Sequence, residues 1–290
     1  MRDEKKLNPK PKFRKPVFAK KSLGQNFLVD QSYINKIISA LNPNKDETII
    51  EIGAGRGALT ERLIEKAGEV IAIELDRNLI PVLQNKFGKN ENFILFEQDA
   101  LKINFKQILS TQHSALDIKL VANLPYYIST AILQRIIEQS EIFSEIVLML
   151  QREVVERITA EPGNKERGFL TVLVEAEFSA GKLFDVPPTA FAPVPKVWSS
   201  VVRLTTKDNS GDKILNKNLF REVVSLGFMQ KRKTILNNLK NASGILSERF
   251  ENKGGIIRVL ERLNIEPIRR AETLTFTEWK SLCNYLNGET

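Results

Sequence analysis

Gly53, Gly55 and Gly57 form the first group of residues whose spacing indicates chemistry. They follow the apolar run Thr48–Ile52 and lead into a helix-like segment. Glycine lets the main chain turn sharply and lets a ligand approach the backbone closely. A strand, a glycine-rich turn and a helix in this order are typical of a site for a nucleotide-like ligand. The spacing Gly53-x-Gly55-x-x-Ala58 also fits the dinucleotide fingerprint.

Acidic side chains follow the next strand-like runs. Glu74 ends the second run, and a carboxylate there can accept hydrogen bonds from both ribose hydroxyls of NAD or of S-adenosylmethionine. Asp99 follows the third run, where it could accept from an adenine amino group while the N–H of Ala100 donates to a ring nitrogen. Glu51 lies before the glycines, where methyltransferase loops often carry an acid. These residues favour S-adenosylmethionine.

The run Asn123-Leu124-Pro125-Tyr126 comes directly after a fourth strand-like segment. An exocyclic adenine amine is a poor nucleophile because its lone pair is delocalised into the ring. The Asn123 side-chain oxygen and the Leu124 carbonyl can each accept one N–H of such an amine, and Pro125 fixes the turn that aims them. Tyr126 can stack on an extruded base. The motif therefore predicts methyl transfer to an adenine amine without a strong base.

The elements that must position these motifs alternate between strand-like and helix-like patterns. This rhythm predicts an α/β fold with a mostly parallel sheet and helices on both faces, in which the strand ends share one edge. Strands are expected at Thr48–Ile52, Val70–Glu74, Phe93–Glu97, Leu120–Ala122, Ile146–Leu150 and Ser199–Leu204. From Lys213 onward only helices are expected, at Leu219–Phe228, Lys233–Leu239, Ile256–Leu263 and Phe276–Leu286.

Charge is distributed unevenly along the chain. Residues 1–21 carry nine basic and two acidic residues, residues 22–212 carry 20 and 25, and residues 213–290 carry 14 and eight. The segments therefore have net charges of +7, −5 and +6, within a total of +8. Two basic ends suggest a polyanionic partner, most simply nucleic acid, although solvated charge is the alternative for any single side chain. Candidate phosphate contacts are Arg14, Lys15, Lys20, Lys21, Lys231, Arg232 and Lys233.

Composition excludes several classes of protein. One cysteine and one histidine exclude a disulfide framework, a cysteine-rich zinc site and a multi-histidine metal centre, so no metal is expected. No apolar run approaches the roughly 20 residues that span a bilayer, so no membrane partner is expected. The basic start lacks an apolar stretch typical of a secretory signal, and a cytoplasmic location follows as the default.

Together the ordered motifs resemble those of the ribosomal RNA adenine dimethyltransferase family. Lys21–Leu28 resembles its opening motif, and Phe191–Ser199 resembles its late Phe-x-Pro-x-Pro-x-Val-x-Ser motif. The resemblance implies a Rossmann-like methyltransferase domain with a seven-stranded sheet and a small helical C-terminal domain. It also implies that Phe191 faces the target adenine opposite Tyr126. By the same resemblance the contacts to S-adenosylmethionine would be Asn26, Leu28, Gly53, Gly55, Glu74, Asp99, Ala100 and Asn123.

The C-terminal stretch resembles the branch of this family that acts on the small ribosomal subunit. That resemblance implies N6,N6-dimethylation of two adjacent adenosines in the 3′-terminal hairpin loop of 16S rRNA by a monomeric enzyme. Residues 1–20 would be a flexible basic arm and 21–205 the methyltransferase domain, with 206–212 as a linker and 213–290 as the helical RNA-binding domain. The run Arg167-Gly168-Phe169 departs from the Tyr-Gly start expected there, and the arm is longer and more basic than expected.

Three alternatives remain open at this level. The target could be 23S rRNA, as in macrolide resistance, because the chemistry would be the same. A non-catalytic RNA-binding assembly factor could retain the methyltransferase shell, although the intact Asn123–Tyr126 motif argues against it. An NAD-linked dehydrogenase would account for the glycine loop but not for that motif or for the basic ends.

Overall fold

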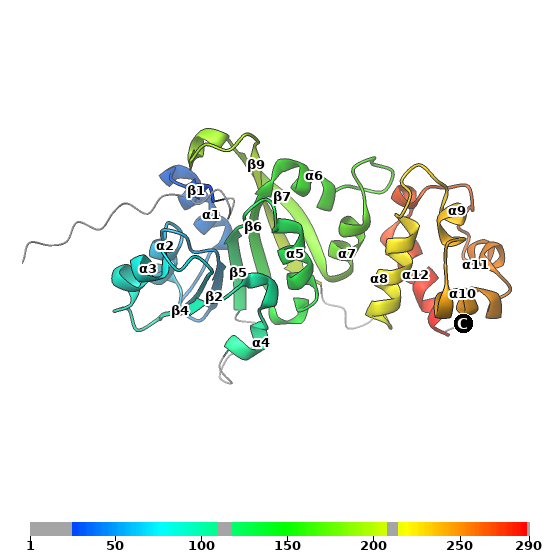
Figure 1. Cartoon of the computed structure of the whole chain (residues 1–290), viewed down its shortest axis with the longest axis horizontal. Helices are drawn as coiled ribbons and strands as arrows, with labels where there is room; N and C mark the ends of the chain where they lie inside the picture. The colour runs from blue at the N-terminus through cyan, green and yellow to red at the C-terminus, as the bar shows by residue number, and fades with distance from the viewer. Residues whose placement is uncertain (1–24, 110–117, 208–213, 289–290) are drawn as a thin grey trace, which may run out of the picture.

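The computed structural model of the chain describes residues 25–109, 118–207 and 214–288. Its centre is a seven-stranded sheet with the strand order β4-β3-β2-β5-β6-β9-β7 (Figure 1). The first five strands are parallel, and β9 pairs antiparallel with both β6 and β7. The strands are β2 (Thr48–Ile52), β3 (Glu69–Glu74), β4 (Phe93–Glu97), β5 (Ile118–Asn123), β6 (Glu145–Gln151), β7 (Phe178–Val186) and β9 (Ser199–Thr206). The expected α/β fold with a mostly parallel sheet is confirmed.

Helices cover both faces of this sheet because successive strand side chains point in opposite directions. Ile49 of β2 packs in one apolar cluster with side chains of α1 (Gln31–Leu41), α2 (Thr60–Lys66) and α3 (Ile80–Phe87). Its neighbour Ile50 packs in the other cluster, with side chains of the helices that follow β4. Those helices are α4 (Phe105–Ile108), α5 (Ser129–Ile137), α6 (Arg152–Ile158) and α7 (Phe169–Glu177).

The predicted strands lie within a residue or two of those observed, but the sequence did not predict β7. This strand holds Gly181 and Lys182, pairs with β9 alone, and breaks register between Lys182 and Phe184. An irregular edge strand lacks the continuous apolar run that marks a central parallel strand. The short strands β1 (Phe27–Leu28) and β8 (Phe191–Ala192) were also missed, because each is two residues long.

The C-terminal segment is helical in the part of the chain that the structure describes. It contains α8 (Lys217–Gly227), α9 (Ile235–Leu239), α10 (Gly244–Asn252), α11 (Ile256–Arg262) and α12 (Phe276–Asn287), of which α10 was not predicted. Helices α8 and α12 contact α7, and one apolar cluster runs from Phe178, the first residue of β7, to Phe220 and Trp279. The two parts thus share a core, and the predicted division at residues 206–212 stays a prediction.

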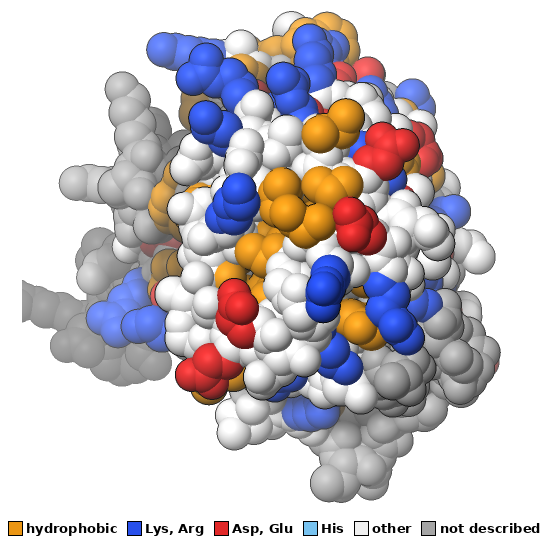
Figure 2. Space-filling model, turned by 90° about the vertical axis from the view of Figure 1, so that its right-hand side faces the viewer, with side chains coloured by type: hydrophobic (Ala, Val, Ile, Leu, Met, Phe, Trp, Pro, Cys, Tyr) orange, Lys and Arg blue, Asp and Glu red, His pale blue; other side chains and the backbone are white. Residues whose placement is uncertain are grey.

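Figure 2 shows the end of the molecule that this helical segment forms. Hydrophobic side chains gather near the middle of that face, and Lys and Arg side chains lie around them and along one edge. The segment exposes the side chains of Ile245, Ile257 and Ile268. Lys231, Arg232 and Lys233 are exposed as well, in the turn between α8 and α9.

Candidate active site

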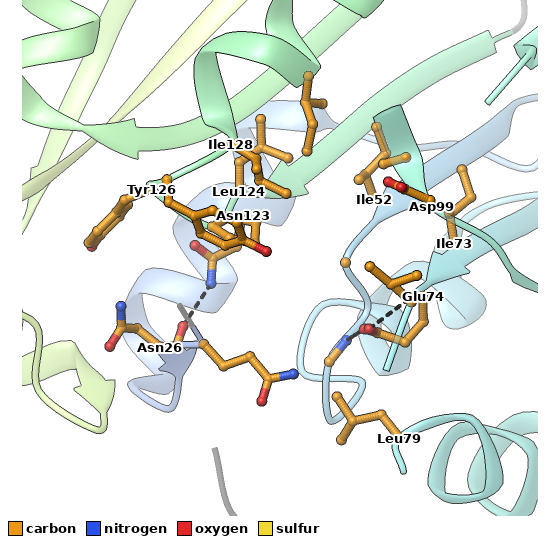
Figure 3. A pocket seen from close by; sticks show the side chains of 18 of the residues that line it. Asn26, Ile52, Ile73, Glu74, Leu79, Asp99, Asn123, Leu124, Tyr126 and Ile128 are labelled. Atoms are coloured by element: carbon orange, nitrogen blue, oxygen red, sulfur yellow. Dashed lines mark hydrogen bonds between the residues drawn. The ribbon is translucent and has the colours of Figure 1, made fainter. Parts of the chain in front are cut away.

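A pocket lies at the edge where β2, β3 and β5 end, as expected for an open parallel sheet. It holds about 800 Å³ of empty space, part of it open to solvent. Its lining comes from the glycine loop, from the residues after three strands and from the segment 25–27. Figure 3 shows Glu74 and Asp99 on one side of this pocket and Asn123 and Tyr126 on the other.

The glycine loop turns back under the pocket through left-handed backbone conformations. Gly53 has a φ of +75° and Gly55 a φ of +60°, which side-chain-bearing residues rarely adopt. A Cβ at Gly53 would meet only the Asn123 carbonyl, at 3.8 Å, so the space above it belongs to the pocket. A Cβ at Gly55 would lie 3.2 Å from the Phe27 ring. Gly53 therefore keeps the backbone accessible to a ligand, whereas the missing side chain at Gly55 makes room for the Phe27 ring.

Glu74 is held rigidly at the end of β3. One carboxylate oxygen accepts the Gly55 N–H at 2.8 Å, and the other accepts the N–H groups of Leu75 and Asp76 at 2.9 and 2.8 Å. Burial raises the pKa of this carboxyl group, and these three hydrogen bonds partly oppose the rise. A carboxylate offers about four acceptor sites, so one is left for a ligand hydroxyl.

Asp99 and Ala100 line the same side of the pocket after β4. One Asp99 oxygen accepts the Leu101 N–H at 3.0 Å and caps the short 3₁₀ helix Ala100–Lys102. The cap fixes the Asp99 side chain at the pocket wall. Glu51 is elsewhere: it is 2% exposed, does not line the pocket and accepts the Thr60 hydroxyl at 2.6 Å. Glu51 therefore supports the loop from behind.

Asn123 is oriented by the opening motif. Its side-chain N–H donates to the Asn26 carbonyl at 3.2 Å, across 97 residues of sequence (Figure 3). Because the amide nitrogen is used in this way, the amide oxygen is the atom left to accept from a ligand. Both residues line the pocket. The sequence placed Asn26 and Asn123 in one site, and the structure brings them together.

Tyr126 stands on the turn that follows Asn123. Its hydroxyl lies 2.7 Å from the Ser199 hydroxyl, and its carbonyl accepts the Ser129 hydroxyl at 3.1 Å. Partial burial raises the pKa of the phenol, so the hydroxyl stays protonated at neutral pH. Leu124, Pro125 and Tyr126 all line the pocket. The motif is thus assembled at one wall of the pocket.

Leu28 and Phe191 do not line the pocket. They are register partners in the β1–β8 pairing, and their side chains are 5% and 2% exposed within the core. This two-stranded sheet joins the opening motif to the late proline-rich motif. Neither residue lines the pocket, and their two expected roles stay predictions.

The structure adds lining residues that sequence reasoning missed. Phe27 lies over Gly55, and the Arg56 guanidinium is 4.6 Å from its ring centroid. Tyr127 lines the pocket with 58% of its side chain exposed, and Leu79 closes the acidic side. The available signal for Phe27 was its place in the opening motif Lys21–Leu28. For Tyr127 it was the position directly after the motif Asn123–Tyr126.

The remaining predicted residues are distributed as follows. Lys231, Arg232 and Lys233 are exposed in the helical segment and do not line the pocket. Arg14, Lys15, Lys20 and Lys21 lie outside the described residues. Among the residues that are described, no group of three His, Cys, Asp or Glu side chains could hold a metal ion. No helix in that part of the chain is long and apolar enough to cross a membrane.

Comparison with known proteins gives the family. The model of the family described as ribosomal RNA adenine dimethylase matches residues 18–282. The chain belongs to this family. It is therefore a methyltransferase whose methyl donor is S-adenosylmethionine. The family assignment confirms the resemblance on which the expected cofactor rested, and it excludes the dehydrogenase alternative.

Curated relatives and solved structures agree with this family. The ribosomal RNA small subunit methyltransferase A of Clostridium botulinum (strain Okra / Type B1) is 44% identical over 262 residues, covering 90% of this chain and 92% of that protein. That of Geobacillus thermodenitrificans (strain NG80-2) is 40% identical over 268 residues, covering 92% and 90%. A dimethyladenosine transferase from Plasmodium falciparum superposes with a TM-score of 0.76 at 26% identity, covering 90% of this chain and 97% of the other.

Proposed function

We propose that this enzyme dimethylates the N6 amine of two adjacent adenosines in the 3′-terminal hairpin loop of 16S rRNA, as a cytoplasmic monomer acting on the small ribosomal subunit. The observation that carries the proposal is the Asn123–Asn26 hydrogen bond, which leaves the Asn123 oxygen to accept from an amine. The relatives at 40–44% identity are named as small subunit methyltransferases, which favours 16S rRNA over other substrates.

The residues that line the pocket fit S-adenosylmethionine. Glu74 offers its remaining acceptor site to a ribose hydroxyl, and Asp99 offers an acceptor to the adenine amino group. The open space above Gly53 allows the donor to lie against the loop backbone. When bound, S-adenosylmethionine supplies a methyl group on a positively charged sulfur. Apolar side chains such as Ile52 and Ile73 line the pocket and would pack against the bound donor.

The protein contributes orientation rather than a strong base. The Asn123 side-chain oxygen and the Leu124 carbonyl each accept one N–H of the target amine, which favours a pyramidal nitrogen with its lone pair free. Tyr126 holds the adenine ring by stacking. Such positioning and preformed hydrogen bonding supply most of the rate increase in reactions of this kind. Monomethyladenosine keeps one N–H for these acceptors, which allows a second transfer.

A large-subunit target is the second candidate. A 23S rRNA methyltransferase, ErmE, superposes with a TM-score of 0.66 at 23% identity, which shows a shared fold only. The identity to small-subunit relatives over about nine-tenths of the chain favours 16S rRNA. Lys231, Arg232 and Lys233 in the helical segment, with Arg14, Lys15, Lys20 and Lys21 before it, are proposed to bind RNA phosphates.

The test is methyl transfer from labelled S-adenosylmethionine to small and large ribosomal subunits that lack adenine dimethylation. We expect dimethyladenosine in 16S rRNA alone from the unaltered enzyme, detected by nucleoside mass spectrometry. Asn123→Ala should abolish transfer while calorimetric binding of the donor persists at a reduced level. Label in 23S rRNA would move the target to the large subunit. Full transfer by Asn123→Ala would reject the amine-orienting role.

A further inference from the structure

Two large aromatic side chains beside the pocket have no aromatic or cation partner among the described residues. Tyr127 is 58% exposed and lines the pocket, and Trp198 is 45% exposed in the segment before β9. Most aromatic rings in the described chain are instead packed against other rings or against the core. Exposed aromatic surface beside a ligand site is typical of recognition surfaces.

The sheet places both rings at the same edge. Ser199, the first residue of β9, is the register partner of Gln151, the last residue of β6. The start of β9 therefore lies at the edge where the parallel strands end and where the pocket opens. The hydrogen bond between Tyr126 and Ser199 ties the two chain segments together at 2.7 Å. Tyr127 and Trp198 are the direct sequence neighbours of that pair.

The backbone is hydrogen-bonded at Trp198 and at the residue before Tyr127, so both rings stand on structured segments of the chain. The Trp198 carbonyl accepts the Arg152 N–H at 3.0 Å, and the Tyr126 carbonyl accepts the Ser129 hydroxyl. Arg152 and Lys196 add positive charge beside Trp198, and both side chains are exposed. Arg152 also forms a solvent-exposed ion pair with Glu156 at 3.5 Å. A preformed aromatic surface with a lysine beside it suits single-stranded RNA.

RNA chain continuity identifies the occupant. An adenosine whose N6 amine is in the pocket remains joined by phosphates to both neighbouring nucleotides, which must lie at the mouth. An adenine amine is accessible only when the base is unpaired or extruded, so the neighbouring bases are available for stacking. We propose that Tyr127 and Trp198 stack on unpaired bases that flank the target adenosine. This inference rests on the proposed function. It assigns Tyr127 and Trp198 to the protein surface that binds the RNA on either side of the target adenosine.

The fluorescence of Trp198 can report RNA binding at this surface. The chain has two tryptophans, and Trp279 is fully buried against Phe228, so RNA-dependent changes in emission report on Trp198. The ligands are an RNA hairpin with unpaired adenosines in its loop and a fully paired RNA duplex of equal length. We expect the hairpin to quench tryptophan emission and the duplex to leave it unchanged. Trp198→Leu should abolish the quenching while transfer of labelled methyl groups stays measurable.

Affinity measurements test the contribution of each ring. Trp198→Leu and Tyr127→Ala should each weaken hairpin binding about tenfold, because stacking of one base on an aromatic ring has that size. The loss should be the same at low and high salt, since stacking, unlike a phosphate contact, releases no counterions. Ile94→Ala, at an exposed apolar position on β4 outside the helical segment, is the control and should leave hairpin binding unchanged.

The outcomes separate this proposal from the proposed function. Methylation of the hairpin with unchanged tryptophan emission would overturn the stacking proposal and leave the function intact. Equal quenching by hairpin and duplex would overturn it too, because stacking requires unpaired bases. Quenching by the hairpin without methylation of any ribosomal RNA would support the RNA surface and reject the proposed reaction.

Discussion

The Tyr126 hydroxyl and the Ser199 hydroxyl lie 2.7 Å apart although 73 residues separate them in sequence. Ser199 is fully buried, and its main chain is paired on both sides, with Gln151 of β6 and Val186 of β7. Tyr126 instead stands on a turn. The hydrogen bond therefore connects the proposed base-stacking ring to a rigid central strand, and a supported ring of this kind holds its ligand more accurately.

Ser199→Ala should lower kcat about tenfold and leave the affinity for S-adenosylmethionine within about twofold, because small misplacements of reacting groups cost rate rather than binding. Tyr126→Phe should do the same, and the double variant should be no worse than either single one. Steady-state transfer assays and calorimetry measure these quantities.

Ser200→Ala is the matched control for Ser199→Ala. Ser200 is equally buried and adjacent, but its hydroxyl bonds to Asp185. Its replacement should leave kcat unchanged. Additive losses in the Tyr126→Phe and Ser199→Ala double variant would contradict a shared positioning role. Tyr126→Ala separately tests the ring: if it keeps full activity, the stacking role of Tyr126 is wrong.

Glu74→Gln should lower the affinity for S-adenosylmethionine at least tenfold. The amide nitrogen would face either the Gly55 N–H or those of Leu75 and Asp76, and two donors cannot bond. Only the ionised carboxylate can accept a hydrogen bond at every one of its acceptor sites. Burial raises the pKa of Glu74, and the affinity of the unaltered enzyme for S-adenosylmethionine should fall as the pH drops through that pKa. Calorimetry from about pH 8 to about pH 5 measures both effects.

The control for this substitution is Glu97→Gln. Glu97 is the register partner of Glu74 on β4, but it is exposed and ion-paired with Arg77 at 2.8 Å. Its replacement should leave donor affinity and its pH profile unchanged. A Glu74→Gln enzyme that binds the donor as tightly as the unaltered one would remove the ribose contact from the proposal.

Glu51→Gln should change how stability depends on pH. Burial raises the pKa of Glu51 to about 7 from its ordinary value of 4.5. The folded state therefore binds a proton that the unfolded state has lost, and the free energy of unfolding falls as pH rises between these values. Glutamine removes this decline, so above about pH 7 the variant should be more stable, by up to about 3 kcal/mol.

Denaturant unfolding at a series of pH values measures this effect. Glu74 is present in both proteins, and its charge adds to the rise in the pKa of Glu51, so the difference between their curves reports on Glu51 together with this interaction. The Thr60 hydroxyl keeps an amide partner in the variant, which avoids an unpaired buried group. Parallel stability profiles for the two proteins would show that Glu51 titrates alike in the folded and unfolded states.

Replacing Lys231, Arg232 and Lys233 with glutamine should weaken RNA binding and flatten its salt dependence. Each lost phosphate contact reduces the slope of log affinity against log salt by about 0.7 to 0.9. Lys106→Gln is the control, because the Lys106 side chain, on α4, already forms an ion pair with Glu141 at 2.9 Å. Filter binding between about 50 and about 200 mM salt gives the slopes. An unchanged slope would mean that none of the three residues contacts a phosphate.

The sequence by itself determined the residues that form the pocket's two sides. Glu74, Asp99 and Asn123 each follow a short apolar run, and parallel strands bring their carboxyl ends to one edge whatever the details of packing. Local periodicity is enough for that step, because an apolar run predicts a buried strand and the glycine loop predicts the turn after it. The motif order then indicated the family.

The tertiary structure alone decided how these residues are oriented. The Asn26 carbonyl selects which end of the Asn123 amide faces the ligand, and Ser199 fixes the Tyr126 ring. The β1–β8 pairing buries Leu28 and Phe191, which the motifs had placed at the ligand. These contacts join segments far apart in sequence. They depend on the antiparallel addition of β9 to the sheet and on side-chain packing, neither of which leaves a periodic signal in the chain.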